Sequence, residues 1–303
     1  MRARRLPLAL PLGLAGAFVA ARLLADSNQL DTMVSTVSYA SQSWLARVLP
    51  EAHGIYVSLA GLELVLMTFG WAYLFLSGKL NAGGMLSTAI QKIIFLGLLI
   101  MTLQFFPLFV PKILATFETA GGDVAGIRGL SPTALLDQGI YLASLIVYNS
   151  DYAGFIDPWA VATSLLLSAL LFTCFALLAW RMTSLLIEAN ILLGGGALFL
   201  GFGASRFTVQ LAENYIVSLI RLGIHTYLIL FMVAVGNQLV PLWGDELSAY
   251  LFSVDGFAVL FRIAGEVLIF TLITLRLPSR LAYELTAPSG FLHLRQSLLG
   301  SQG

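Results

Sequence analysis

Charged residues are scarce in this sequence. Its 303 residues include 16 basic and 16 acidic side chains, which make up 11% of the chain, while hydrophobic residues make up 58%. A typical soluble domain has about 25% charged and about 45–50% apolar residues. Because the two signs cancel, the chain has no long-range positive field that would hold nucleic acid or acidic partners. The composition predicts an integral membrane protein, in which any contact with DNA is local or is made by a partner.

Cysteine and histidine are also rare. Cys174 is the single cysteine, so the chain cannot form an internal disulfide, and its apolar neighbours predict a packing role. The histidines at positions 53, 225 and 293 are far apart and show no metal-ligand spacing. The glycine-rich stretch at 194–203 lacks the Gly-Lys-Ser/Thr ending of a phosphate-binding loop. Ser205, just after it, lacks the closing glycine of a nucleophile elbow. We therefore expect no catalytic residues, no cofactor and no metal.

Residues 1–25 admit two interpretations. Arginines at positions 2, 4 and 5 precede an apolar run that ends at about Ala21, as in a secretory signal. Pro7 and Pro11 interrupt this run, and it is shorter than the roughly 20 residues of a membrane span. This favours a signal-like segment over a retained first membrane helix. Both interpretations place the following residues outside the cytoplasm.

Two amphipathic helices are predicted outside the spans. Residues 26–50 predict a periplasmic helix capped by Asp26 and ended by Pro50, lying on the outer membrane surface or, alternatively, packed as a soluble helix. A second helix is expected from Pro132 to about Val147, because Ser131 caps it and proline suits the first helical position. It belongs to a periplasmic segment at 118–157, and its apolar face predicts that it also lies on the outer surface.

Five long apolar runs predict an all-α, polytopic membrane domain at 51–280. Each run is near or above the roughly 20 residues that a spanning helix needs. They cover residues 54–76, 92–117, 158–180, 212–240 and 256–275. By the positive-inside rule, the placing of lysine and arginine between the runs gives five spans with the amino end outside. Residues 281–303 then form a short cytoplasmic tail.

A glycine-rich segment at 191–203 separates the third and fourth runs. Its glycines are Gly194, Gly195, Gly196, Gly201 and Gly203. The segment is too short for a span, so we expect a re-entrant or broken helix that its neighbours bury; a short sixth span is the alternative. The glycines are consistent with close helix packing and equally with a functional bend that lines a passage.

Ionisable residues inside the apolar runs are candidate functional residues, because charge at membrane depth is costly. Two i,i+4 sets share a helix face, one formed by Arg221 with His225 and one by Arg262 with Glu266. Two roles remain open for Arg262 and Glu266. They can form an ion pair that fixes helix packing, or they can line a hydrated conduit. Glu63 and Glu188 are candidate interhelical partners of the arginines.

One stretch resembles a known family. Residues 200–208 read Leu-Gly-Phe-Gly-Ala-Ser-Arg-Phe-Thr and contain Ser205 and Arg206, with Glu188 upstream. This is similar to the signature of the TrbL family of conjugal-transfer proteins, relatives of the polytopic VirB-type subunit of type IV secretion systems. Glu63 resembles an acidic position in the early span of that family. Ser131 and Pro132 resemble its helix opening on the outer face.

The resemblance implies a multi-pass subunit of the bacterial inner membrane without enzymatic activity. It implies that the subunit assembles into a homo-oligomeric ring in the lipid bilayer and contacts secretion ATPases and periplasmic bridging subunits. Such a subunit forms or organises the passage for DNA–protein or protein substrates and contacts them transiently. The sequence alone leaves two other classes open. One is a secondary transporter or small-solute channel, and the other is a membrane scaffold that conducts nothing.

Overall fold

The computed structural model describes residues 28–78, 82–124, 131–153, 158–250 and 256–286. Within these ranges all regular structure is helical and no strand occurs, so the predicted all-α class is confirmed. The signal-like segment at 1–25, the cap at Asp26 and most of the predicted tail lie outside the described residues.

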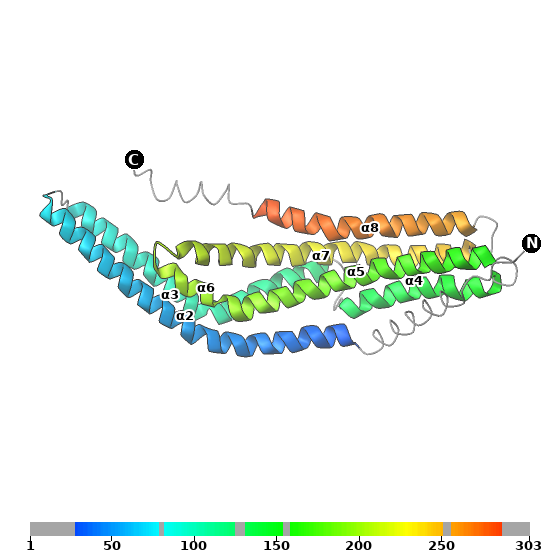
Figure 1. The fold of residues 1–303 in the computed structure, drawn as a ribbon, viewed down its shortest axis with the longest axis horizontal. Coiled ribbons are helices and arrows are strands. Elements are labelled where there is room, and N and C mark those ends of the chain that lie inside the picture. The colour runs from blue at the N-terminus through cyan, green and yellow to red at the C-terminus, as the bar shows by residue number, and fades with distance from the viewer. Residues whose placement is uncertain (1–27, 79–81, 125–130, 154–157, 251–255, 287–303) are drawn as a thin grey trace, which may run out of the picture. The chain divides into compact units, whose positions relative to one another are not determined.

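Among the described residues, five helices are long and apolar enough to cross a membrane. They are α2 (Gln29–Leu76), α3 (Ala82–Val124), α5 (Pro158–Gly196), α7 (Val209–Tyr250) and α8 (Gly256–Leu285), shown in Figure 1. Even α8, with 30 residues, has a length of about 45 Å at about 1.5 Å per residue. The hydrocarbon core of a bilayer is only about 30 Å thick. The prediction of five helices that could span a membrane is confirmed, and each of the five is longer than one crossing requires.

The predicted end of the first helix at Pro50 is wrong. α2 continues through this proline to Leu76, and it bends part-way along its length (Figure 1). A proline inside a helix removes one hydrogen bond and bends the axis, but it does not have to end the helix. Residues on both sides of Pro50 pack into the same core, Leu45 before it and Ala52 and Tyr56 after it. Tertiary packing therefore outweighs the local effect of the proline.

The chain divides into two compact units. The α4 unit contains the described parts of 1–35, 118–186 and 225–282, and it includes α4 (Pro132–Ala153). The α6 unit contains the described parts of 36–117, 187–224 and 283–303, and it includes α6 (Leu198–Gly201) and the 3₁₀ turn η1 (Phe202–Ala204). Each unit has its own hydrophobic core.

The helix α4 packs inside its unit. It begins at Pro132, as predicted, but continues to Ala153. Leu142, Ala143 and Ile146 are fully buried, and Leu142 and Ile146 join a core with side chains of α5, α7 and α8. This corrects the expectation that the apolar face of this helix lies on the outer membrane surface. The amphipathic pattern was real, but the face it marks is covered by protein.

The glycine-rich segment continues the third predicted span. α5 includes Gly194, Gly195 and Gly196, and after Ala197 the helical backbone resumes in α6 and η1. The first residue to leave helical conformation is Ser205, with φ −106° and ψ 141°. The segment is therefore a broken helix, one of the two forms that the sequence predicted.

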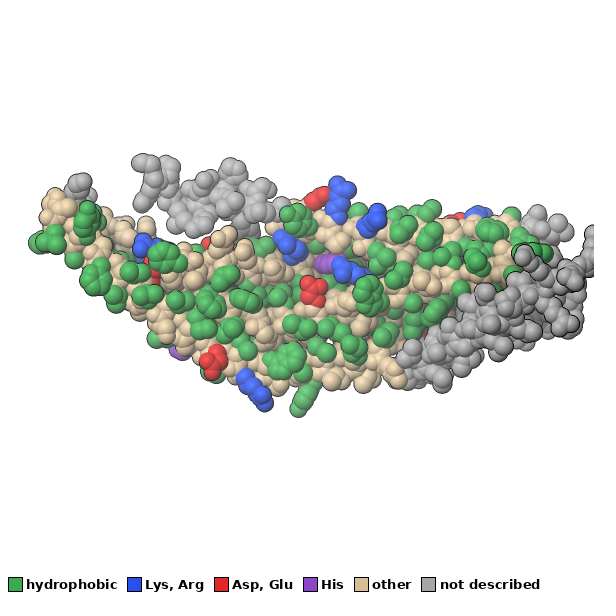
Figure 2. Space-filling view, in the orientation of Figure 1, with side chains coloured by type: hydrophobic (Ala, Val, Ile, Leu, Met, Phe, Trp, Pro, Cys, Tyr) green, Lys and Arg blue, Asp and Glu red, His purple; other side chains and the backbone are tan. Residues whose placement is uncertain are grey.

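Large apolar side chains cover much of the outside of the helices. Figure 2 shows them spread over the visible face of the chain. On α2, Phe69, Tyr73 and Phe75 are each about 70% exposed. Monomers that are surrounded by water rarely expose contiguous apolar surface of this extent. Together with the five long apolar helices, this surface indicates a multi-pass membrane protein.

Candidate functional site

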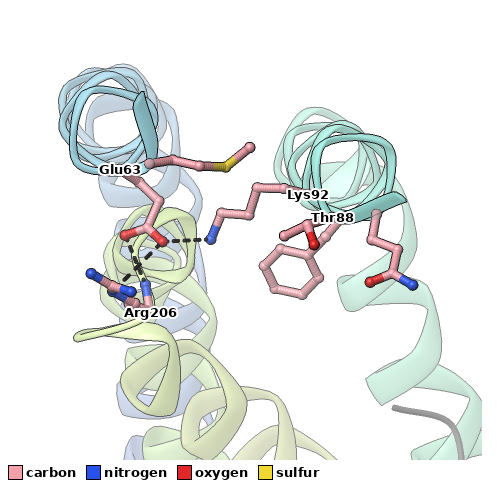
Figure 3. Close-up of a pocket in the computed structure, with 7 residues that line it drawn as sticks. Glu63, Thr88, Lys92 and Arg206 are labelled. Carbon is pink, nitrogen blue, oxygen red and sulfur yellow. Dashed lines mark hydrogen bonds and ion pairs between the residues drawn. The ribbon is translucent and has the colours of Figure 1, made fainter. Parts of the chain in front are cut away.

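A buried carboxylate lies at the centre of the α6 unit. Glu63 is on α2, in the apolar part of that helix, and its side chain is only 8% exposed. Lys92 on α3 points toward it, and Lys92 Nζ donates a hydrogen bond to Glu63 Oε1 at 3.0 Å (Figure 3). The side chain of Lys92 is itself 18% exposed. The two charges form an ion pair between helices that the sequence separates by 29 residues.

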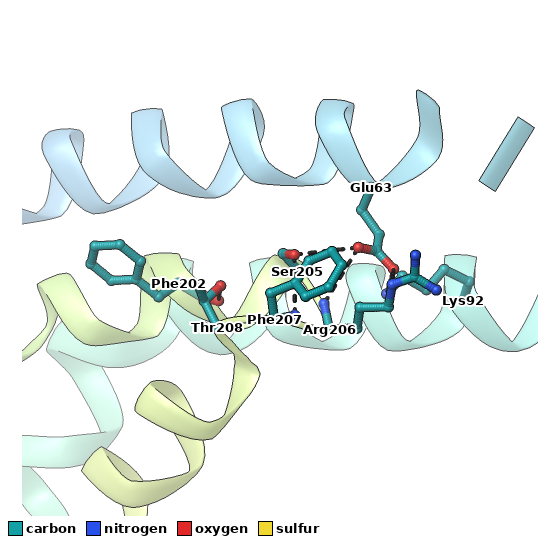
Figure 4. A network of polar contacts seen from close by, with 7 residues as sticks. All are labelled: Glu63, Lys92, Phe202, Ser205, Arg206, Phe207 and Thr208. Carbon is teal, nitrogen blue, oxygen red and sulfur yellow. Dashed lines mark hydrogen bonds and ion pairs between the residues drawn. The ribbon is translucent and has the colours of Figure 1, made fainter. Parts of the chain in front are cut away.

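The second half of the site is the turn at residues 205–208 between η1 and α7. The hydroxyl of Ser205 and the backbone N–H of Arg206 both donate to Glu63 Oε2, at 3.3 and 3.4 Å (Figure 4). Arg206 Nε lies 4.0 Å from Glu63 Oε1. The Glu63 carboxylate thus accepts hydrogen bonds from α3 and from the turn, and it links both to α2.

The turn also has hydrogen bonds of its own. The carbonyl of Ser205 accepts from the backbone N–H groups of Thr208 and Val209, at 3.1 and 2.9 Å, which starts α7. The Thr208 hydroxyl donates to the carbonyl of Phe202, so it connects the turn to η1. The Arg206 guanidinium lies 5.0 Å from the ring centre of Phe207. The sequence Ser-Arg-Phe-Thr therefore fixes the turn locally, while Glu63 fixes its position on α2.

The charges at the site do not cancel. Glu63 contributes one negative charge, and Lys92 and Arg206 contribute two positive charges. Removing a carboxylate from water costs several kcal/mol unless it is paired and hydrogen-bonded, and here three donors and a nearby guanidinium offset that cost. Arg206 is 65% exposed, so most of its guanidinium faces outward. The site has one net positive charge.

A pocket of about 340 Å³ opens beside the ion pair. Its polar lining comes from Glu63, Thr88, Gln91, Lys92 and Arg206, and its apolar lining from Met67 and Phe95. Among the described residues, no group of three or more histidine, cysteine, aspartate or glutamate side chains is arranged to hold a metal ion.

The predicted glycines allow the segment before the turn to approach its neighbours closely. A Cβ at Gly201 would collide with the carbonyl oxygen of Ala52 on α2, and a Cβ at Gly194 would come within 2.7 Å of the carbonyl oxygen of Ser41. Side chains limit the space at two more positions, Gly196 by Tyr215 and Gly203 by Leu99. Gly195 alone of the five has nothing within 4 Å of such an atom.

Arg221 and His225, which the sequence placed on one helix face, each have their partners elsewhere in the fold. Arg221 Nε donates to the hydroxyl of Thr286 at 2.8 Å, and its guanidinium lies 5.0 Å from the ring centre of Tyr283. His225 instead lies 3.5 Å from the guanidinium of Arg181. The i,i+4 spacing was a poor guide here because other helices supply the nearer partners.

The other predicted set does form an ion pair. Arg262 Nε lies 3.9 Å from Glu266 Oε1 along α8. Arg262 also pairs with Glu246, and Glu266 accepts a hydrogen bond from the indole of Trp243 at 2.9 Å. The side chains of Arg262 and Glu266 are 52% and 47% exposed. Glu188 is exposed and has no ion pair within the described part of the chain.

Comparison with known sequences identifies the family. Residues 60–277 match the TrbL/VirB6 plasmid conjugal transfer protein family. The chain belongs to this family. The matched range contains Glu63, Lys92, Ser205 and Arg206, so every polar residue of the ion cluster lies within the part that defines TrbL/VirB6 proteins.

Two TrbL relatives support the assignment. A probable conjugal transfer protein TrbL of Sinorhizobium fredii is 26% identical over 266 residues, which cover 87% of this chain and 65% of the relative. The conjugal transfer protein TrbL of Rhizobium radiobacter is 23% identical over 221 residues, which cover 72% of this chain and 53% of the relative. The chain thus spans between half and two thirds of the length of these TrbL proteins. The match shows that it belongs to a family of plasmid conjugal transfer proteins.

Lys92 was missed as a site residue in the sequence. It stands at the start of an uncharged apolar stretch that ends at Lys112, and from the sequence alone it marks only the edge of a span. A useful signal was available, because Glu63 is the single charged residue in the apolar run at 54–76. A lone buried acid requires a basic partner, and Lys92 is among the few cations in this part of the chain.

Proposed function

We propose that this TrbL/VirB6 protein is an inner-membrane subunit that forms or organises the passage for DNA–protein or protein substrates of a type IV secretion machine. The observation that carries the proposal is the Glu63 ion cluster. It ties the α6–η1 turn to α2 and α3 within the part of the chain that matches the family. Ionisable groups on apolar helices are functional candidates by default because keeping them there is costly.

The cluster acts in this proposal by holding the turn in one position. Ser205 and Arg206 each bind Glu63 through a hydrogen bond, while Gly201 allows the preceding helix to contact the backbone of α2. A substrate passage needs walls with a fixed arrangement, and a buried ion cluster specifies one arrangement at some cost in stability. The protein contributes no bond-making chemistry; the energy for transfer comes from secretion ATPases.

The partners follow from the same proposal. Copies of the chain assemble into a homo-oligomeric ring in the inner membrane, and periplasmic bridging subunits and secretion ATPases contact opposite ends of it. The exposed Arg206 and Phe207, which are 65% and 71% exposed, offer a cationic and aromatic surface at the turn for such a contact. Transient contact with the transferred DNA or protein takes place inside the ring.

The test is conjugal transfer efficiency in cells whose own copy of the gene is replaced by variants. Glu63→Gln removes the charge but keeps the size of the side chain, and we expect transfer to fall at least about tenfold while membrane accumulation stays near the wild-type level. Glu188→Gln is the matched control, because Glu188 is an acid on an apolar helix with no ion pair among the described residues, and this variant should transfer normally. Normal transfer by Glu63→Gln would remove the cluster from the mechanism.

A further inference from the structure

The pocket beside Glu63 has more hydrogen-bond donors than the protein uses. Lys92 has three N–H donors, of which one is bonded to Glu63. Arg206 has five side-chain donors, and only its Nε approaches the carboxylate, at 4.0 Å. Gln91 adds an exposed side-chain amide to the same lining. With one net positive charge, this donor set suits an anion with several acceptor oxygens, such as a phosphate group.

The position of Lys92 along α3 indicates where this pocket lies in a bilayer. No charged residue occurs between Lys92 and Lys112. Twenty residues of helix span about 30 Å, which is about the thickness of the hydrocarbon core. This spacing is the one expected of two lysines at its two boundaries, with the pocket at Lys92 near the lipid headgroups.

The surface next to the pocket suits acyl chains. Met67 and Phe95 form its apolar wall. On a neighbouring face, α3 exposes a stripe of large apolar side chains, namely Ile94, Leu98, Met101 and Phe105. Their spacing of four, three and four residues places them on one face of the helix. The stripe is about 16 Å long, close to the depth of one leaflet, which is about 15 Å.

We propose that the pocket between α2, α3 and the turn at 205–208 binds the headgroup phosphate of an anionic phospholipid. Lys92 and Arg206 donate to the phosphate oxygens, Gln91 lies at the rim, and the acyl chains lie along the stripe on α3. Glu63 holds both cations in place and lowers the net charge from two to one. This proposal does not depend on the proposed function, because lipid binding is a property of the purified chain.

The experiment measures lipid retention by the full chain in detergent that contains equal amounts of phosphatidylglycerol and phosphatidylcholine, by native mass spectrometry. We expect the wild type to retain phosphatidylglycerol preferentially. Lys92→Gln and Arg206→Gln should each lower that preference about fivefold, which corresponds to about 1 kcal/mol per cation near the headgroups. Arg206 is mostly exposed, so its variant tests the proposal even if Lys92→Gln fails to fold.

One control variant separates a pocket from general attraction to basic residues. Lys112→Gln removes an exposed lysine at the other boundary of the same helix and should leave the preference unchanged. The proposal is overturned if Lys112→Gln lowers retention as much as Lys92→Gln, or if neither pocket cation matters.

A third arm distinguishes a lipid from a free anion. Inorganic phosphate is added in large excess to the wild-type complex. Phosphatidylglycerol should remain bound, because its acyl chains contribute apolar contact that phosphate lacks. Displacement of the lipid by inorganic phosphate would assign the pocket to a free phosphate and contradict the lipid proposal.

Discussion

The two units of the chain treat charge on apolar helices in opposite ways. In the α6 unit the carboxylate of Glu63 is 8% exposed and its partners come from residues 29 to 143 positions away. In the α4 unit Arg262 and Glu266 are about half exposed and stand one helical turn apart. Removing one partner of a buried ion pair lowers the free energy of unfolding strongly, whereas an exposed pair contributes little to it. The contrast teaches that a buried ion cluster fixes helix packing in the α6 unit, whereas the ion pairs of Arg262, one of which links α7 to α8, lie exposed at the surface of the α4 unit.

The largest effect should follow removal of the buried carboxylate. Glu63→Ala leaves Lys92 without its ion-pair partner and leaves the donors of Ser205 and Arg206 unpaired, so we expect the free energy of unfolding to fall by about 3 kcal/mol. Denaturant unfolding of the purified chain in detergent measures this. A change below 1 kcal/mol would mean that the buried pair is no more important than an exposed one.

A smaller effect is expected where the glycine-rich segment contacts α2. Gly201→Ala places a Cβ against the carbonyl oxygen of Ala52, and the forced shift should destabilise the protein by about 2 kcal/mol. Gly195→Ala is the matched control in the same segment, because nothing lies within 4 Å of its added atom. Alanine is the better helix former, so this variant should gain about 0.5–1 kcal/mol. Equal effects at the two positions would refute the close approach at Gly201.

The smallest effect belongs to the exposed pair of the α4 unit. Arg262→Gln removes the contacts to Glu246 and Glu266, yet the free energy of unfolding should change by less than about 1 kcal/mol because solvent screens these charges. Raised salt should abolish even that difference. A loss as large as that of Glu63→Ala would erase the distinction between the two units.

Local patterns predicted the local features well. Hydrophobic runs located all five spans, Ser131 and Pro132 located the start of α4, and the i,i+4 rule located the Arg262–Glu266 pair. Long-range features were harder, because the periodicity of a helix tells which face is apolar but not which other helix covers it. This is why α4 was expected on a membrane surface, and why Arg221 was grouped with His225.

The candidate site was predicted in part for the same reason. Glu63, Ser205 and Arg206 stood out as polar residues in apolar surroundings, but their meeting depends on how three helices pack. Lys92 is one of a few cations that could pair with Glu63, but a separation of 29 residues does not select it among them. Pro50 shows the converse error, because a local rule predicted a helix end that the shared core of Leu45 and Tyr56 overrides.

The most direct test of the buried cluster is crosslinking between α2 and the turn in intact membranes. Glu63→Cys and Ser205→Cys are combined in a chain whose own Cys174 is replaced by alanine, and a short thiol-specific reagent is added. We expect rapid intramolecular crosslinking, because Ser205 Oγ lies 3.3 Å from the Glu63 carboxylate. We expect no crosslink when Glu188→Cys replaces Glu63→Cys. Absence of the first crosslink, or equal yield from both pairs, would contradict the account.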